Sequence, residues 1–175
     1  MATNNTTTSS IGVCGEKRFI SITKEKDDFQ YYKDYVDNYV NRNYKGENVR
    51  FLDLNTALYR MLELMLERCH DVDGKNSLAG DIVFYAVSLA AQADLPIYIE
   101  EGKGNEARQQ DAQTLASDFC LTAKTISTSY MKYMKDPDNR RQREEFAFEL
   151  AELIDVTYAL SGTRTLHDLL SINIQ

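Results

Sequence analysis

The chain has few of the residues that build turns, cross-links and metal sites. Its 175 residues include eight glycines, two prolines, three cysteines, two histidines and no tryptophan. So few glycines and prolines provide little turn chemistry for a many-stranded β protein, which favours a helical bundle. Cys14, Cys69 and Cys120 are odd in number and widely spaced, so they indicate neither a disulfide framework nor a C-x-x-C metal or redox site. We interpret them as reduced, buried thiols.

Long hydrophobic runs and an excess of basic residues are also missing. No apolar run reaches the roughly 18 residues needed to span a bilayer, and no charged-then-apolar signal segment opens the chain. The net charge of −7 argues against direct binding to a phosphate backbone, which requires a basic face. We therefore expect no direct contact with membranes or nucleic acid. We expect a cytoplasmic protein, or one within a virus particle assembled in the cytoplasm, and not a secreted one.

The strongest pattern in the chain is an apolar helix at residues 81–93. At about 100° per residue, its few polar side chains fall in one stripe roughly 60° wide. A helix that is apolar over most of its circumference belongs at the centre of a helical protein. The polar stripe either lines a ligand cleft or forms the solvent-facing edge of this helix. It consists of Asp81, Tyr85, Ser88 and Gln92.

The sequence predicts an all-α, single-domain bundle of five to six helices around a central apolar helix at about residues 78–94. Residues 1–16 are polar and almost uncharged, so we expect a flexible or partner-ordered N-terminal arm. Residues 17–175 then form the helical domain, with at most one short strand or extended segment at residues 17–24. The other expected helices cover about residues 27–44, 53–69, 105–134 and 137–160, with a short last helix after Thr165.

Capping residues indicate where these helices begin and end. Ser77 can cap the central helix, and Asp73-Gly74 reads as the turn before it. Asp136 and Pro137 suit the cap and the first position of the following helix, which stops at residues 161–162. Thr165 and Asp168 have the spacing of a capping box. Two buried faces are predicted: Leu58, Met61, Leu62, Met65 and Leu66 on one helix, and Leu115, Phe119, Ile126, Tyr130 and Tyr133 on another.

An acidic stripe late in the chain is the clearest candidate for chemistry. Glu145, Glu149, Glu152 and Asp155 recur at helical spacing, and carboxylates so placed can hold Mg²⁺. The run Glu152-Leu-Ile-Asp155 resembles the second metal motif, ExxD, of the all-α MazG-like nucleoside triphosphate pyrophosphohydrolases. That resemblance implies a Mg²⁺-dependent enzyme with Glu149, Glu152 and Asp155 as metal ligands.

Two observations weigh against this enzyme. The preceding helix should supply the family's first acidic motif, ExxE, but residues 117–124 contain one carboxylate. The apolar residues around Leu150 centre roughly 130° away from the acids, so we expect the acids to face solvent. A solvated acidic face, balanced by Arg140, Arg141 and Arg143, is the simpler interpretation. Cys69-His70-Asp71 likewise lacks the ligands of a zinc site and the spacing of a calcium loop.

The remaining signals favour a protein-binding role. The first predicted helix carries Tyr32, Tyr35 and Tyr39, and tyrosine combines a large apolar ring with a polar tip that suits interfaces. We therefore expect a non-enzymatic interaction or assembly subunit with a protein partner or with itself, without a cofactor. A connector or other structural component of a viral or phage particle is one example. The alternatives are the Mg²⁺-dependent pyrophosphohydrolase and an inhibitor that binds a host enzyme.

Overall fold

The computed structural model describes residues 29–39, 51–67, 71–97, 99 and 101–174. Every regular element among them is a helix. The proposed N-terminal arm at residues 1–16 and the short strand at residues 17–24 lie outside the described residues. The all-α, single-domain class predicted from the sequence is confirmed.

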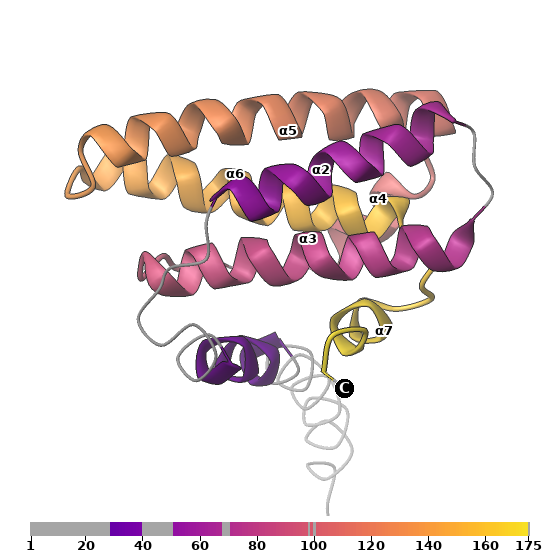
Figure 1. Ribbon diagram of the computed structural model, residues 1–175, viewed down its shortest axis with the longest axis horizontal. Coiled ribbons are helices and arrows are strands. Elements are labelled where there is room, and N and C mark those ends of the chain that lie inside the picture. The colour runs from indigo at the N-terminus through magenta and orange to yellow at the C-terminus, as the bar shows by residue number, and fades with distance from the viewer. Residues whose placement is uncertain (1–28, 40–50, 68–70, 98, 100, 175) are drawn as a thin grey trace, which may run out of the picture.

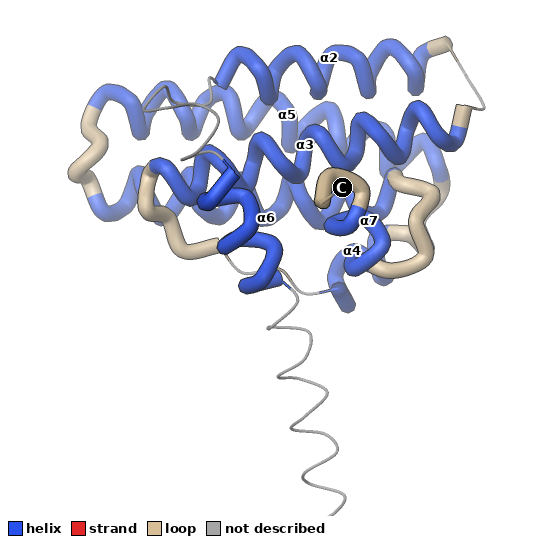
Figure 2. The backbone as a smooth tube through the Cα atoms, turned by 60° about the horizontal axis from the view of Figure 1, so that its bottom comes forward, coloured by secondary structure: helices blue, strands red, loops and turns tan. Residues whose placement is uncertain are grey.

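Four long helices form the body of the molecule, and each runs antiparallel to its neighbours (Figures 1 and 2). α2 packs against α3, α3 against α6, and α6 against α5. Two short helices and a helical segment at residues 29–39 cover the outside of this bundle. The bounds are α2 Phe51–Leu66, α3 Val72–Gln92, α4 Glu101–Ala107, α5 Ala112–Lys135, α6 Arg140–Leu160 and α7 Leu166–Ser171.

The apolar helix α3 lies at the centre, as predicted. It contacts α2, α6 and α7, and Phe84 meets the ring of Tyr39 from the 29–39 segment edge-on at 5.5 Å. The apolar side chains of α3 have little contact with water because neighbouring helices cover α3 on several sides. The fully covered positions include Ile82, Val83, Ala86, Val87 and Ala90.

The start of α3 differs from the prediction. The helix begins at Val72, not near residue 78, and Asp71 caps it by accepting a hydrogen bond from the Gly74 N–H at 2.9 Å. Asp73-Gly74 therefore lies in the first helical turn and does not form a turn between helices. A Cβ at Gly74 would lie against the Asp71 carboxylate, so a larger residue here would require that side chain to shift. Ser77 is an exposed residue inside the helix.

The predicted helix at residues 105–134 is two helices, α4 and α5. Asp111 separates them because its carboxylate accepts hydrogen bonds from the Thr114 N–H at 2.9 Å and the Thr114 hydroxyl at 2.7 Å. A capping side chain at this point satisfies backbone donors that a continuous helix would pair internally. The predicted packed side of α5 is confirmed, with Leu115, Phe119 and Ile126 buried.

The turn between α5 and α6 also differs from the prediction. Asn139 caps α6, and its Oδ1 accepts from the Gln142 N–H at 3.3 Å. Asp136 instead ends α5, and Pro137 lies in the turn before the cap. The predicted end of α6 at residues 161–162 and the Thr165–Asp168 capping box are confirmed.

Arg108 fixes the C-terminal end of α6. Its Nη2 donates to the Tyr158 carbonyl at 2.8 Å and to the Ser161 hydroxyl at 3.2 Å. Its guanidinium carbon also lies 3.9 Å from the centroid of the Tyr158 ring. A cation at this end satisfies carbonyls that have no partner within the helix and interacts favourably with the helix dipole. We assign Arg108 to this structural role.

Candidate functional site

The acidic stripe of α6 is less exposed than the sequence predicts. Glu149 and Glu152 are half-buried and Asp155 is buried, so the expectation of a fully solvated face is wrong. The physical reason is that α6 packs against α5, α3 and α4 together, which leaves little of its circumference in contact with water. The sequence pattern identifies the most apolar side of α6 but not how many neighbours cover the other sides.

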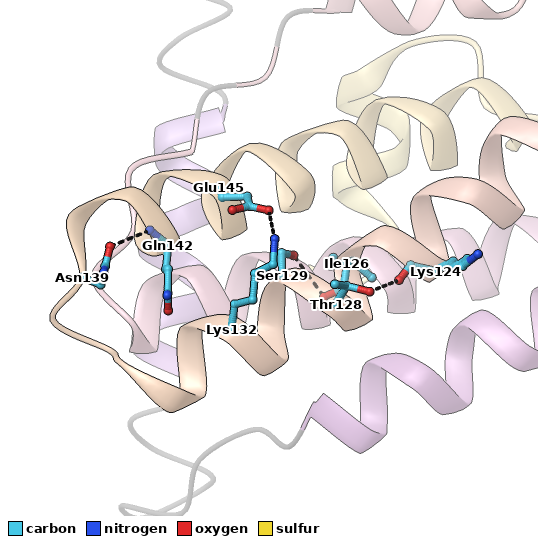
Figure 3. A network of polar contacts seen from close by, with 8 residues as sticks. All are labelled: Lys124, Ile126, Thr128, Ser129, Lys132, Asn139, Gln142 and Glu145. Atoms are coloured by element: carbon cyan, nitrogen blue, oxygen red, sulfur yellow. Dashed lines mark hydrogen bonds and ion pairs between the residues drawn. The ribbon is translucent and has the colours of Figure 1, made fainter.

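The stripe lies beside α5, and a lysine from that helix reaches it. Lys132 Nζ is 2.7 Å from Glu145 Oε1 (Figure 3). Burial raises the pKa of Glu149, the neighbouring charges of Glu152 and Glu145 raise it further, and Lys132 acts in the opposite direction. No group of three or more acidic, histidine or cysteine side chains in the described part of the chain is placed to hold a metal ion. The assignment of Glu149, Glu152 and Asp155 as Mg²⁺ ligands stays a prediction.

The three tyrosines proposed as interaction residues differ in exposure. Tyr32 is buried in the core, Tyr35 is half-buried, and Tyr39 is 40% exposed. Burial raises the pKa of Tyr32 above its ordinary value, as expected for a phenol removed from water. Tyr35 and Tyr39 stack on each other with centroids 6.3 Å apart. Of the three, Tyr39 therefore presents the most surface to a partner, and Tyr32 serves the core.

The polar stripe of α3 lines a small cleft against α2. Asp81 and Tyr85 face Asp53, Thr56 and Arg60 of α2 across a volume of about 110 Å³. Burial raises the pKa of Asp81, while a hydrogen bond with Asn173 and the charge of Arg60 act in the opposite direction. Ligand pockets are usually about 300–1,000 Å³, so this cleft is small for an organic substrate. Ser88 is buried and donates to the Phe84 carbonyl at 2.7 Å.

A larger recess lies between α2 and α5. On this side of the four-helix body, the two neighbouring helices are not closely packed. The two helices run antiparallel (Figure 1) and have few contacts. At one end Phe51 stacks on Tyr130, with ring centroids 4.0 Å apart. Beyond this point lies a groove of about 450 Å³. The groove is lined by Asn55, Leu58, Tyr59 and Leu62 of α2 and by Cys120, Ala123, Lys124, Ser127 and Thr128 of α5.

The α2 side of this groove carries large exposed apolar side chains. Leu52, Tyr59 and Leu66 are 63%, 70% and 82% exposed and recur at seven-residue intervals. The prediction that Leu66 is buried is therefore wrong, whereas Leu58 and Met61 are buried as expected. α2 is apolar over more than the face that meets α3, so one part of its apolar surface stays open. A seven-residue repeat keeps side chains on one side of a helix, as in helices that pack lengthwise against another helix.

The α5 side of the groove is built from small side chains. Cys120, Ala123 and Ser127 leave a shallow surface opposite Leu58 and Leu62. Cys120 is an exposed free thiol, which corrects the expectation that it is buried. Lys124 is the one charged side chain among the described residues that line the groove. The groove therefore combines an apolar floor, small side chains on one wall and a single cation.

Sequence analysis did not identify this groove. Its one local signal is the spacing of Leu52, Tyr59 and Leu66, which repeats along α2 on a side distinct from Leu54, Ala57 and Met61. Such a double stripe indicates that a helix has apolar surface for two neighbours. The sequence does not show that only one of them, α3, is a close neighbour in the fold.

No protein-family model matches the chain, and no similarity was found to curated proteins or to solved structures. Within the described residues, no helix combines the length and apolar character needed to cross a membrane. The functional interpretation therefore rests on the geometry of the chain itself.

Proposed function

We propose that this chain is a non-enzymatic protein-binding or assembly subunit whose binding surface is the α2–α5 face. We define this face as the groove together with the exposed stripe Leu52, Tyr59 and Leu66. The observation that carries the proposal is that α2 exposes three large apolar side chains in line beside a groove of about 450 Å³. Contiguous exposed apolar surface of this kind marks interaction sites in soluble proteins.

The chemistry of the face suits a protein partner. Tyr59 stands at its middle and is 70% exposed, and tyrosine is among the residues that dominate binding energy when an interface buries them. Leu58 and Leu62 provide an apolar floor, and Lys124 can select a partner that carries a carboxylate. The groove runs along about two turns of each helix and is open at the surface, which fits a helix better than a compact metabolite.

An assembly role extends this proposal. A subunit of a larger particle, such as a connector or structural component of a virus or phage, requires surfaces for neighbouring subunits on a stable body. The 29–39 segment provides a second, smaller aromatic surface, with Tyr31 65% exposed. The inhibitor hypothesis uses the same α2–α5 face and differs only in the partner.

The proposal is tested by comparing two matched substitutions. Tyr59→Glu places a charge in the middle of the α2–α5 face, whereas Phe148→Glu places one on an exposed aromatic residue of α6 that does not line the groove. Tagged variants are used to capture partners from the source of the protein, and bound proteins are quantified by mass spectrometry. We expect Tyr59→Glu to lose specific partners by about tenfold or more and Phe148→Glu to retain them. Equal capture by both variants contradicts the proposal.

The pyrophosphohydrolase alternative has its own test. Release of pyrophosphate from the common nucleoside triphosphates is measured with and without Mg²⁺, for the unmodified chain and for Glu152→Gln. The protein-binding proposal predicts no turnover in any of these reactions. Mg²⁺-dependent turnover that Glu152→Gln abolishes would establish the enzyme instead.

A further inference from the structure

We infer that the α2–α5 face binds a second copy of this chain, related to the first by a two-fold axis that runs along the groove. This inference rests on the proposed function and names its partner. In this arrangement α2 of each copy lies on α5 of the other copy. The α2 and α5 helices of the two copies then form an antiparallel four-helix arrangement at the dimer interface.

The sizes of the side chains favour this pairing. The α2 side of the face presents Tyr59, Leu62 and Leu66, whereas the α5 side presents Cys120, Ala123 and Ser127. Within one copy Phe51 stacks on Tyr130, and the two helices are antiparallel. Counted from this stack along antiparallel helices, Leu62 lies within about one residue of the level of Cys120, and Tyr59 within about one residue of the level of Ala123. An axis along the groove preserves these levels, so the large side chains of one copy meet the small ones of the other, as close packing requires.

The charges beside the face select the same axis. At about 100° per residue, Lys124 lies beside the small side chains of α5, on the side that is remote from α2. Glu63 lies beside the exposed stripe of α2, on the side that is remote from α5. Rotation about the groove brings these two flanks together. Glu63 of one copy and Lys124 of the other are then offset by about 9 Å along the helices, which two extended side chains can span. Each dimer gains two such pairs.

A two-fold axis across the helices gives the opposite result. It would place α2 on α2 and α5 on α5, with large side chains against large ones and small against small. It would also bring Lys124 close to Lys124 of the other copy, because this residue lies near the middle of the groove. Like charges and mismatched sizes disfavour that arrangement. The chain as a whole carries a net charge of −7. Among the described residues, no acidic side chain lines the groove, so repulsion between two copies is small on this face.

The test is a charge exchange followed by sedimentation equilibrium on the full chain. We expect the unmodified chain to dimerise, and Glu63→Lys or Lys124→Glu alone to weaken the dimer by about tenfold. The double variant Glu63→Lys/Lys124→Glu should recover most of that loss because the two pairs re-form with reversed signs. Lys103→Glu, on exposed α4, makes the same charge change away from the face and should leave the dimer unchanged. Circular dichroism confirms that each variant is folded.

Two outcomes overturn the inference. The first is a chain that stays monomeric at concentrations up to about 100 µM. The second is a dimer whose affinity responds to Lys103→Glu as strongly as to Lys124→Glu, or that the double variant does not restore. A monomeric chain whose Tyr59→Glu variant loses a different protein partner refutes the second copy but supports the proposed function. A chain for which neither dimer nor partner responds to Tyr59→Glu refutes both.

Discussion

Two polar side chains in this molecule, at Thr157 and Asp81, are fully or partly buried at a cost to the stability of the fold. Thr157 is fully buried on α6, and its hydroxyl has no hydrogen-bond partner among the described residues. Several other hydroxyls in the helices donate to a carbonyl of the preceding turn, as when Thr125 donates to the Leu121 carbonyl at 2.9 Å. An unsatisfied buried hydroxyl costs about 1–3 kcal/mol relative to a bonded one. Asp81 is a second case, because partial burial opposes its charge.

Thr157→Val is therefore expected to stabilise the fold. Valine has nearly the same shape but removes the unpaired hydroxyl, so the free energy of unfolding should rise by about 1 kcal/mol. Urea denaturation followed by circular dichroism measures the change. Thr125→Val is the matched control because it removes a hydroxyl that is bonded, and it should give no gain. A loss of stability in Thr157→Val would show that its hydroxyl has a partner in solution.

Asp81→Asn is expected to make stability less dependent on pH. The pKa of Asp81 is raised in the folded state, so the folded protein binds this proton more tightly than the unfolded chain. The free energy of unfolding therefore decreases as the pH rises above the unfolded pKa of about 4 and through the raised folded pKa. Asparagine removes this penalty and can still accept the hydrogen bond from Asn173. The urea midpoint of Asp81→Asn should exceed that of the unmodified chain at pH 7 and coincide with it at pH 3.

A substitution in an exposed turn controls for the loss of charge in that comparison. Asp138→Asn changes an exposed carboxylate between α5 and α6 and should leave the pH profile close to that of the unmodified chain. If both variants shift the midpoint at pH 7 equally, relief of the overall negative charge explains the gain. The local burial of Asp81 would then not be its cause.

At the scale of single elements, capping side chains decide where helices begin. α5 and α6 meet in a short turn at residues 136–139, in which Asp136, Asp138 and Asn139 all have the chemistry of a helix cap. The structure assigns the cap of α6 to Asn139 and the end of α5 to Asp136. Figure 3 shows Asn139 and Gln142 joined at this point.

Asn139→Ala should therefore destabilise the chain more than Asp136→Ala. Loss of an N-cap side chain costs about 1 kcal/mol, because it leaves a backbone N–H of the first turn without its partner. Among the described residues, the Asp136 carboxylate accepts a hydrogen bond from the Asn139 side chain, at 3.2 Å, and caps no backbone N–H, so its loss should cost less. Urea denaturation of the two variants, with the exposed Asp138→Ala as a control, measures the difference. A larger cost for Asp136→Ala would place the cap where the sequence pattern predicts it.

The same turn illustrates what can be predicted from the sequence. The central position of α3, the end of α6 and the Thr165–Asp168 capping box were predictable because each depends on residues close together in the chain. Asp136 and Asn139 were not separable because both have capping chemistry within four residues. The exposure of Leu66 and the burial of Asp155 were not predictable, because each depends on which helices become neighbours.

At the scale of the whole molecule, the uneven packing of four long helices creates the candidate site. Three pairs of neighbours, α2 with α3, α3 with α6 and α6 with α5, pack closely, whereas α2 and α5 have few contacts. The core is formed by the closed sides, and the open side retains exposed apolar surface on α2. This face depends on how two helices far apart in the sequence lie next to each other. A local sequence pattern therefore could not predict it.

If the open side binds a second copy, the thermal stability of the chain should depend on its concentration. A dimer that unfolds to separate chains gains stability with concentration by mass action, and a tenfold increase changes the dissociation equilibrium by about 1.4 kcal/mol per dimer. For a chain of this size we expect the melting temperature to rise by about 2 °C for each tenfold increase. Differential scanning calorimetry between about 1 and 100 µM tests this. Phe148→Glu should keep the dependence and Tyr59→Glu should lose it, because Tyr59 lines the groove whereas Phe148 is an exposed residue of α6 that does not. A melting temperature that is constant with concentration in the unmodified chain would mean that the open side does not close on another copy of itself.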